Sequence, residues 1–252
     1  MRSELLSRMK DVKAQRLAHE VWESWTQRWP ILQEATNELL DRYFARYPEK
    51  ILYGLCVADL ATQKEFRRIM CEPPSAVVDK ARFLALEDAM EAIIERWRAR
   101  VDSQFRGLFV KAKIATPKNV DVLTLATTVF SGCDWPRAFK WFPQVVSDYE
   151  VRPYTPDYAG KDAYLKFVHK QDCDGSRYMG CSRASIRPVK PNKSVRMIIE
   201  MCGKDPDTAT AAEMDVLDVR VVSKESVIMD WRTAVSPFYP PGCWSVYSRA
   251  VR

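Results

Sequence analysis

Histidine and glycine are scarce in this chain of 252 residues, which contains two His and eight Gly. The sequence has no Cys-x-x-Cys pair, no Gly-x-Ser-x-Gly segment and no glycine-rich phosphate-binding loop. Acid–base and nucleophilic catalysis need a positioned base beside a nucleophile, or paired carboxylates. Because the usual patterns for such sites are missing, we expect a protein without enzymatic activity. An enzyme of an unfamiliar type is the most distant alternative.

Long apolar runs are also absent. No stretch approaches the roughly 18 uninterrupted apolar residues of a membrane span. The amino end, MRSELLSRMKDVK, is charged and carries no apolar signal core. With 47% hydrophobic and 29% charged residues, the composition is that of a globular chain with a packed core. We therefore expect an intracellular protein, cytoplasmic or nuclear, with no membrane partner.

Seven cysteines, an odd number, are scattered along the chain, and we expect reduced thiols. A structural zinc site would draw its ligands from Cys133, His169, Cys173 and Cys181. Zinc knuckles place two cysteines only a few residues apart, and the pair at positions 173 and 181 is wider than that. We expect no cofactor, and bound zinc is the lesser alternative.

The glycine and proline content differs between two regions of the chain. Residues 1–115 contain two Gly and four Pro, whereas residues 116–252 contain six Gly and eleven Pro. Because these residues interrupt helices, the sequence predicts a mainly α fold with a small α+β part. Residues 1–115 should form an elongated helical hairpin or bundle. Residues 116–252 should form a compact, turn-rich α+β domain with a β-hairpin.

Apolar residues near the amino end follow helical spacing. They recur every three to five residues, which predicts that they share one helix face: Leu5, Met9, Val12, Leu17, Val21, Trp25 and Trp29. Pro30 should kink or restart this helix, and Pro48 should end it.

A second helical pattern runs from Val78 to Ala112 and predicts one helix about 50 Å long. Trp97 and Phe105 share this helix with four arginines, a combination that suits stacking on single-stranded nucleic acid: Arg96, Arg98, Arg100 and Arg106. Both aromatic residues lie on the apolar stripe, which places them in the core. The net charge of +6 is also spread evenly, because residues 1–115 and 116–252 hold 20 and 19 basic residues against 17 and 16 acidic ones. We do not expect a nucleic-acid partner.

The second region carries shorter signals. We expect a helix that starts at Asn119 or Asp121 and runs through Val129, another over 136–146 and a strand over 164–168. Asn192 should cap a helix over 193–201 that Gly203 ends. Thr210 and Glu213 match a capping box, and 216–222 and 227–231 alternate like the strands of a hairpin. Carboxylates gather near this box and are interpreted as caps and surface charges: Asp205, Asp207, Glu213, Asp215 and Asp218.

Aromatic residues gather near the carboxyl end, where prolines and a glycine interrupt them. They either fill the base of the second domain or form an interaction surface for another protein: Trp231, Phe238, Tyr239, Trp244 and Tyr247. The sequence leaves both alternatives open.

The block CGKDPDTATAAEMDVLDVR at 202–220, followed by VIMDWRTAV at 227–235, resembles the carboxy-terminal region of the F-box-type protein family of mushroom-forming fungi. LATTVFSGC at 125–133 is similar to another block of that family. Where the family tends to carry a second cysteine pair, this chain has Ser223 and Ser226, and serine is a poor zinc ligand.

The resemblance implies a non-enzymatic protein-interaction region of the substrate-recruiting kind. The family's F-box, which docks on a ubiquitin-ligase adaptor, has no counterpart in the sequence, so direct adaptor binding is not expected and the protein partner is unknown. The alternative is a metal-stabilised nucleic-acid or regulatory binding module.

Overall fold

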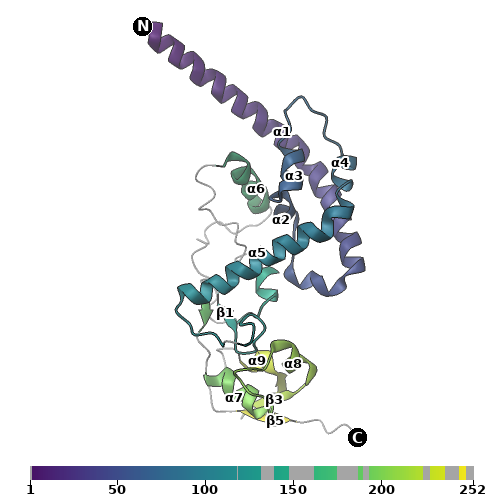
Figure 1. Cartoon of the computed structure of the whole chain (residues 1–252), viewed down its shortest axis with the longest axis vertical. Helices are drawn as coiled ribbons and strands as arrows, with labels where there is room; N and C mark the ends of the chain where they lie inside the picture. The colour runs from purple at the N-terminus through teal and green to yellow at the C-terminus, as the bar shows by residue number, and fades with distance from the viewer. Residues whose placement is uncertain are drawn as a thin grey trace. The chain divides into compact units, whose positions relative to one another are not determined.

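The computed structural model describes residues 2–117, 119–131, 139–147, 162–174, 187–189, 193–223, 228–235 and 244–247. Most of these residues are helical, and the strands are short, which confirms the predicted mainly α fold with a small β part (Figure 1). None of the helices in these ranges is both long and apolar enough to cross a membrane.

The chain forms two compact units. The first unit comprises residues 1–51, 55–98 and 154–179, and the second comprises 52–54, 99–153 and 180–252. Neither unit is continuous in sequence, and the change at 98/99 falls inside one helix. Residues 99–115, which the sequence groups with the amino-terminal helices, belong to the second unit.

The first unit is helical. It contains α1 (Arg2–Arg46), α2 (Val57–Ala61), α3 (Lys64–Met70), α4 (Lys80–Leu84), the 3-10 turn η2 (Glu87–Ala89), the start of α5 (Met90–Lys111) and α6 (Ala163–Asp174), while the 3-10 turn η1 (Pro48–Tyr53) follows α1. The predicted single helix over 78–112 is wrong in its first part. Asp79 caps α4 by accepting a hydrogen bond from the Arg82 N–H, and α5 begins only at Met90.

The helix α1 continues through Pro30, so the predicted restart there is wrong. Trp25 and Trp29 are buried, whereas Met9, Val12 and Leu17 are exposed. At about 100° per residue, Met9 and Val12 lie about 140° to 160° around the helix from Trp25. The predicted single apolar face is therefore wrong, because spacings of four and five residues make the stripe drift around the helix. Figure 1 shows the amino-terminal end of α1 extending away from α2, α3 and α4.

The helix α6 replaces the strand predicted over 164–168. Asp162 starts it by accepting hydrogen bonds from the N–H groups of Tyr164 and Leu165, at 3.0 and 3.2 Å. The Tyr164 ring then meets Trp25 edge to face, with the centroids 5.2 Å apart, and Phe167 meets Trp29 at 5.7 Å. These aromatic contacts hold α6 against α1 and stabilise its helical form.

Arg28 holds the loop after α3 against α1. Its buried guanidinium donates hydrogen bonds to four backbone carbonyls, at 2.7 to 3.0 Å: those of Met70, Glu72, Pro73 and Ala76. Burial lowers the pKa of Arg28 from its ordinary value, but a guanidinium stays charged at neutral pH. One side chain thus binds four backbone carbonyls of this segment, including the Pro73 carbonyl, which also accepts from the Ala76 N–H.

The second unit is built around two short antiparallel sheets. It contains the rest of α5, β1 (Val129–Ser131), the 3-10 turn η3 (Gln144–Ser147), β2 (Arg187–Val189), α7 (Lys193–Met201), α8 (Ala211–Val216), β3 (Arg220–Ser223), β4 (Ile228–Asp230), α9 (Trp231–Ala234) and β5 (Trp244–Tyr247). Strand β1 pairs with β2, and β3 lies between β4 and β5. The helix predicted over 119–129 is wrong, since turns lead there into β1. The helix predicted over 136–146 is not seen in its described part, where Lys140 bridges to Phe130 and a turn leads into η3.

The predicted hairpin is confirmed by the β3–β4 pair, with Val221 opposite Met229. Its outer ends differ from the prediction, because Val216 still belongs to α8 and Trp231 begins α9. The predicted helix over 193–201 is confirmed as α7, and Gly203 follows it with a φ of 75°. Its predicted cap, Asn192, lies outside the described residues.

Replacing Arg28 by Met should destabilise the first unit. The substitution keeps a long apolar stem but removes the donors for four carbonyls, so we expect a loss of about 3 kcal/mol or more in the free energy of unfolding. Urea unfolding measures this loss. The matched control is Arg68→Met, because Arg68 is exposed on α3 and its replacement should cost less than about 0.5 kcal/mol. Equal losses in the two variants would contradict the role given to Arg28.

Candidate functional site

The predicted zinc ligands do not form a site in the part of the chain that the structure describes. His169 lies in α6, is half-buried and has an interaction partner. Cys173 is in the same helix, but its side chain is outside the description, and Cys133 and Cys181 lie outside the described residues altogether. Among the side chains that are described, no group of three or more His, Cys, Asp or Glu could hold a metal ion.

The structure describes only some of the aromatic residues near the carboxyl end. Trp231 is buried in the core of the second unit, where it meets Trp141 edge to face at 5.1 Å. Its indole N–H donates to the Asp215 carboxylate at 3.0 Å. This places Trp231 in the core. Of Trp244 and Tyr247 only the backbone in β5 is described, and Phe238 and Tyr239 lie outside the described residues.

The acidic cluster has structural partners, as the sequence suggested. The Thr210 hydroxyl accepts from the Glu213 N–H while Glu213 accepts from the Thr210 N–H, which confirms the predicted capping box of α8. Asp205 accepts from the Asp207 N–H. Three arginines pair with the remaining carboxylates: Arg196 with Asp207, Arg232 with Asp215 and Arg220 with Asp218. The carboxylates of this cluster therefore act as caps and ion-pair partners.

A pocket that the sequence did not predict lies at the end of α5. The helix ends in a Schellman motif, in which the Lys113 N–H donates to the Val110 carbonyl and the Ile114 N–H to the Phe109 carbonyl, both at 3.1 Å. Lys113 has a φ of 53°, in the left-handed region. This motif turns the chain back over Phe109 and brings Ile114 beside it, as the hydrophobic contact of a Schellman motif requires.

The opposite wall of the pocket is anchored to α8. The Ala126 N–H donates to the Ala209 carbonyl at 2.9 Å, and the Ala211 N–H donates to the Thr124 carbonyl at 2.8 Å. These bonds form an antiparallel bridge between Leu125 and Thr210. The bridge joins LATT at 125–128 to the DPDTAT block at 205–210, the two segments that carry most of the family resemblance.

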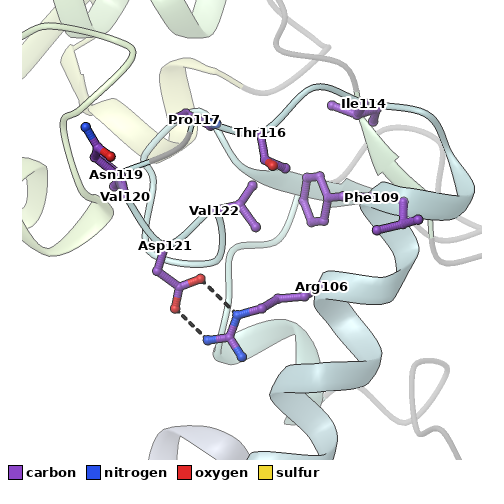
Figure 2. Close-up of a pocket in the computed structure, with 10 residues that line it drawn as sticks. Arg106, Phe109, Ile114, Thr116, Pro117, Asn119, Val120, Asp121 and Val122 are labelled. Atoms are coloured by element: carbon purple, nitrogen blue, oxygen red, sulfur yellow. Dashed lines mark hydrogen bonds and ion pairs between the residues drawn. The ribbon is translucent and has the colours of Figure 1, made fainter.

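The pocket has a volume of about 640 Å³, and we call it the α5 pocket. Figure 2 shows Phe109, Thr116 and Val122 between α5 and the loop that follows it. The lining residues are Arg106, Phe109, Val110, Ile114, Thr116, Pro117, Asn119, Val120, Asp121 and Val122. Phe109 and Val122 are buried, whereas Val110 at the edge is 79% exposed. The hollow is thus lined by six apolar residues together with an ion pair, a threonine and an asparagine, and it has one exposed apolar side chain at its edge.

One end of the α5 pocket is closed by an ion pair. The Arg106 guanidinium donates two hydrogen bonds to the Asp121 carboxylate, at 3.1 and 2.6 Å (Figure 2). The hydrogen bond to Arg106 holds the pKa of Asp121 below its ordinary value, and the same bond raises the pKa of Arg106. Each charge of the pair is therefore neutralised within the protein.

A smaller pocket of about 80 Å³ adjoins the α5 pocket and shares Phe109, Ile114, Pro117 and Val122 with it. Thr127 and Thr128 line this second hollow, and both are buried. The Arg196–Asp207 pair lies at its side. The two pockets thus share apolar residues, and the lining of each includes one bidentate ion pair.

The residues around the two pockets are suited to binding. Neither lining set contains a histidine or a cysteine, and the carboxylates in both are held by arginines. Apolar walls with a few hydroxyl and amide groups hold an apolar side chain and orient the backbone next to it. Sequence analysis missed this site because its apolar residues, Ile114, Val120 and Val122, lie in a loop without helical or strand periodicity.

We compared the chain with models of known protein families, with curated proteins and with solved structures, and found no match in any of the three.

Replacing Lys113 by Gly should stabilise the second unit by about 0.5–1 kcal/mol. A left-handed φ costs an L residue roughly 1–2 kcal/mol, and the greater freedom of glycine in the unfolded chain cancels part of this gain. Urea unfolding measures the change. Lys111→Gly removes the same charge from a helical position and should instead destabilise by up to about 1 kcal/mol. A loss of stability in Lys113→Gly would contradict the left-handed conformation.

The Arg106–Asp121 pair should make stability depend on pH in the acid range. Because the folded pKa of Asp121 is lowered, the contribution of the pair is complete above the ordinary Asp value of about 3.9 and disappears as the pH falls through the lowered pKa. We expect the stability difference between wild type and Asp121→Asn to be about 1 kcal/mol or less at neutral pH. It should shrink below about pH 4, as urea unfolding over a pH series would show. A difference that stays constant down to pH 2 would contradict this assignment.

Proposed function

We propose that this chain is a non-enzymatic protein-interaction region of the substrate-recruiting kind, related to the F-box-type proteins of mushroom-forming fungi. Its proposed contact site is the α5 pocket, which receives an apolar side chain from a segment of a partner protein. The observation that carries this proposal is the pocket itself, an apolar hollow of about 640 Å³ with Val110 exposed at its edge. Exposed apolar side chains beside a hollow are typical of interaction sites.

The position of the resembling blocks supports the same proposal. LATT at 125–128 and DPDTAT at 205–210 are hydrogen-bonded to each other, and Leu125 and Asp207 line the smaller pocket beside the α5 pocket. The residues that carry the resemblance therefore hold in place the loop beside the proposed contact site.

The alternative of a nucleic-acid module has less support among the described residues. Trp97 and Phe105 are buried and cannot stack on bases. Three of the four arginines of α5 form ion pairs, Arg96 with Glu65, Arg98 with Glu95 and Arg106 with Asp121. These ion pairs reduce the positive charge that α5 could offer to the phosphate groups of a nucleic acid.

Val110→Glu should prevent partner binding without unfolding the chain. Val110 is 79% exposed, so a charged side chain is tolerated there, yet the substitution removes the exposed apolar side chain at the edge of the pocket. Val216→Glu is the matched control, because Val216 is 85% exposed in the same unit and is not part of the pocket lining. The two variants have the same charge and should have the same stability.

The measurement is quantitative mass spectrometry of proteins that purify with tagged wild type, Val110→Glu and Val216→Glu from their own cells. We expect a set of partners whose recovery falls about tenfold or more with Val110→Glu, as the loss of a central apolar contact does, and is retained with Val216→Glu. The same partners at equal levels in all three samples would contradict the assignment of the pocket. Recovery of the ligase adaptor and a cullin with wild type would link the chain to a ubiquitin ligase.

A further inference from the structure

Two cations without an acidic partner among the described residues stand in the sequence between Val110 and Ile114, two residues that line the α5 pocket. Lys111 is the last residue of α5, and Lys113 is the left-handed residue of the Schellman motif. Both are exposed. They flank the turn that joins Val110 to Ile114, and these two apolar residues line the pocket. We call this pair the rim lysines.

The described charged side chains that line the two pockets form ion pairs. Arg106 is bound by Asp121, and Arg196 is bound by Asp207, each through two hydrogen bonds. In the sequence no acidic residue occurs between Asp102 and Asp121. Of the charges that the structure describes at this edge, the rim lysines are therefore the ones available to a ligand, and Lys118 of the same loop lies outside the description.

We propose that the ligand of the α5 pocket is an acidic segment of another protein. An apolar side chain of that segment fills the hollow, and carboxylates next to it in the segment pair with Lys111 and Lys113. The inference rests on the proposed function and adds to it the chemical class of the partner. It follows from charge complementarity, because an uncompensated positive rim around an apolar hollow selects ligands of negative charge and disfavours cationic ones.

The pocket fits a peptide better than it fits a nucleic acid. Its largest aromatic side chain, Phe109, is 3% exposed and presents no face on which a base could stack. The cation among its described lining residues, Arg106, is already held by a carboxylate. An apolar hollow is filled by an apolar side chain, which a peptide supplies and a phosphate backbone does not.

Lys113 gives a second reason to look for an anion at this edge. The equivalent residue at the end of α7 is Gly203, in the same Schellman arrangement, with the Gly203 N–H bound to the Glu200 carbonyl and the Lys204 N–H to the Ile199 carbonyl. Glycine adopts the left-handed conformation at less cost than lysine does. Of these two left-handed positions, the one next to the pocket holds a lysine, whereas the other holds a glycine.

A selection from random displayed peptides on the immobilised full-length chain tests the proposal. We expect the recovered peptides to combine apolar residues with Asp or Glu, and their recovery to fall with Val110→Glu, which removes the apolar contact and repels carboxylates. With the double variant Lys111→Glu and Lys113→Glu, binding of the same peptides should weaken about tenfold, since two attractive pairs become repulsive. The same double variant should select peptides rich in Lys or Arg.

The control is the double variant Lys10→Glu and Lys13→Glu, which changes the net charge by the same amount on the exposed part of α1. Its peptide binding should equal that of wild type. The proposal would be overturned if no peptides were selected or if the selected peptides had no acidic bias. It would also be overturned if their binding did not change in the double variant of the rim lysines. The proposed function itself fails separately, when partner recovery from cells does not depend on Val110. Urea unfolding of each variant confirms that the chain is folded in every comparison.

Discussion

The antiparallel bridge between Leu125 and Thr210 is the interaction on which the second unit depends. It pairs two segments about eighty residues apart in sequence through the bonds of Ala126 to Ala209 and of Ala211 to Thr124. Thr210 also caps α8 through Glu213, so one residue fixes both the start of a helix and the position of a loop. That loop leads into β1 and supplies one wall of the α5 pocket.

The end of α5 shows how a helix terminus becomes part of a binding site. A Schellman motif satisfies the last carbonyls of the helix and forces the chain to reverse over an apolar residue. Here the reversal places Ile114 beside Phe109 and leaves Val110 exposed. The pocket therefore depends on the position at which α5 ends. Lys113, the residue in the left-handed position, lies in the turn beside the pocket.

Short-range signals in the sequence predicted local structure well. The capping box at Thr210, the helix over 193–201 with Gly203 after it, and the β3–β4 hairpin depend on neighbouring residues, and the structure confirms them. The helix α6 was missed, although Asp162 before Tyr164 is a capping signal, because its helical form is supported by tryptophans far away on α1. The long helix over 78–112 was extended too far since apolar spacing alone does not reveal the break before Met90.

The sequence by itself determined the mainly α character of the chain, the scarcity of catalytic groups and the local caps and turns, because these depend on residue types and short spacings. Only the tertiary structure decided which apolar residues are buried and that a pocket forms at the end of α5. The physical reason is that periodicity describes one helix at a time, whereas burial depends on which element packs against it. Met9 and Trp25 lie on the same helix and in the same apolar pattern, yet only Trp25 has the partner, α6, that buries it.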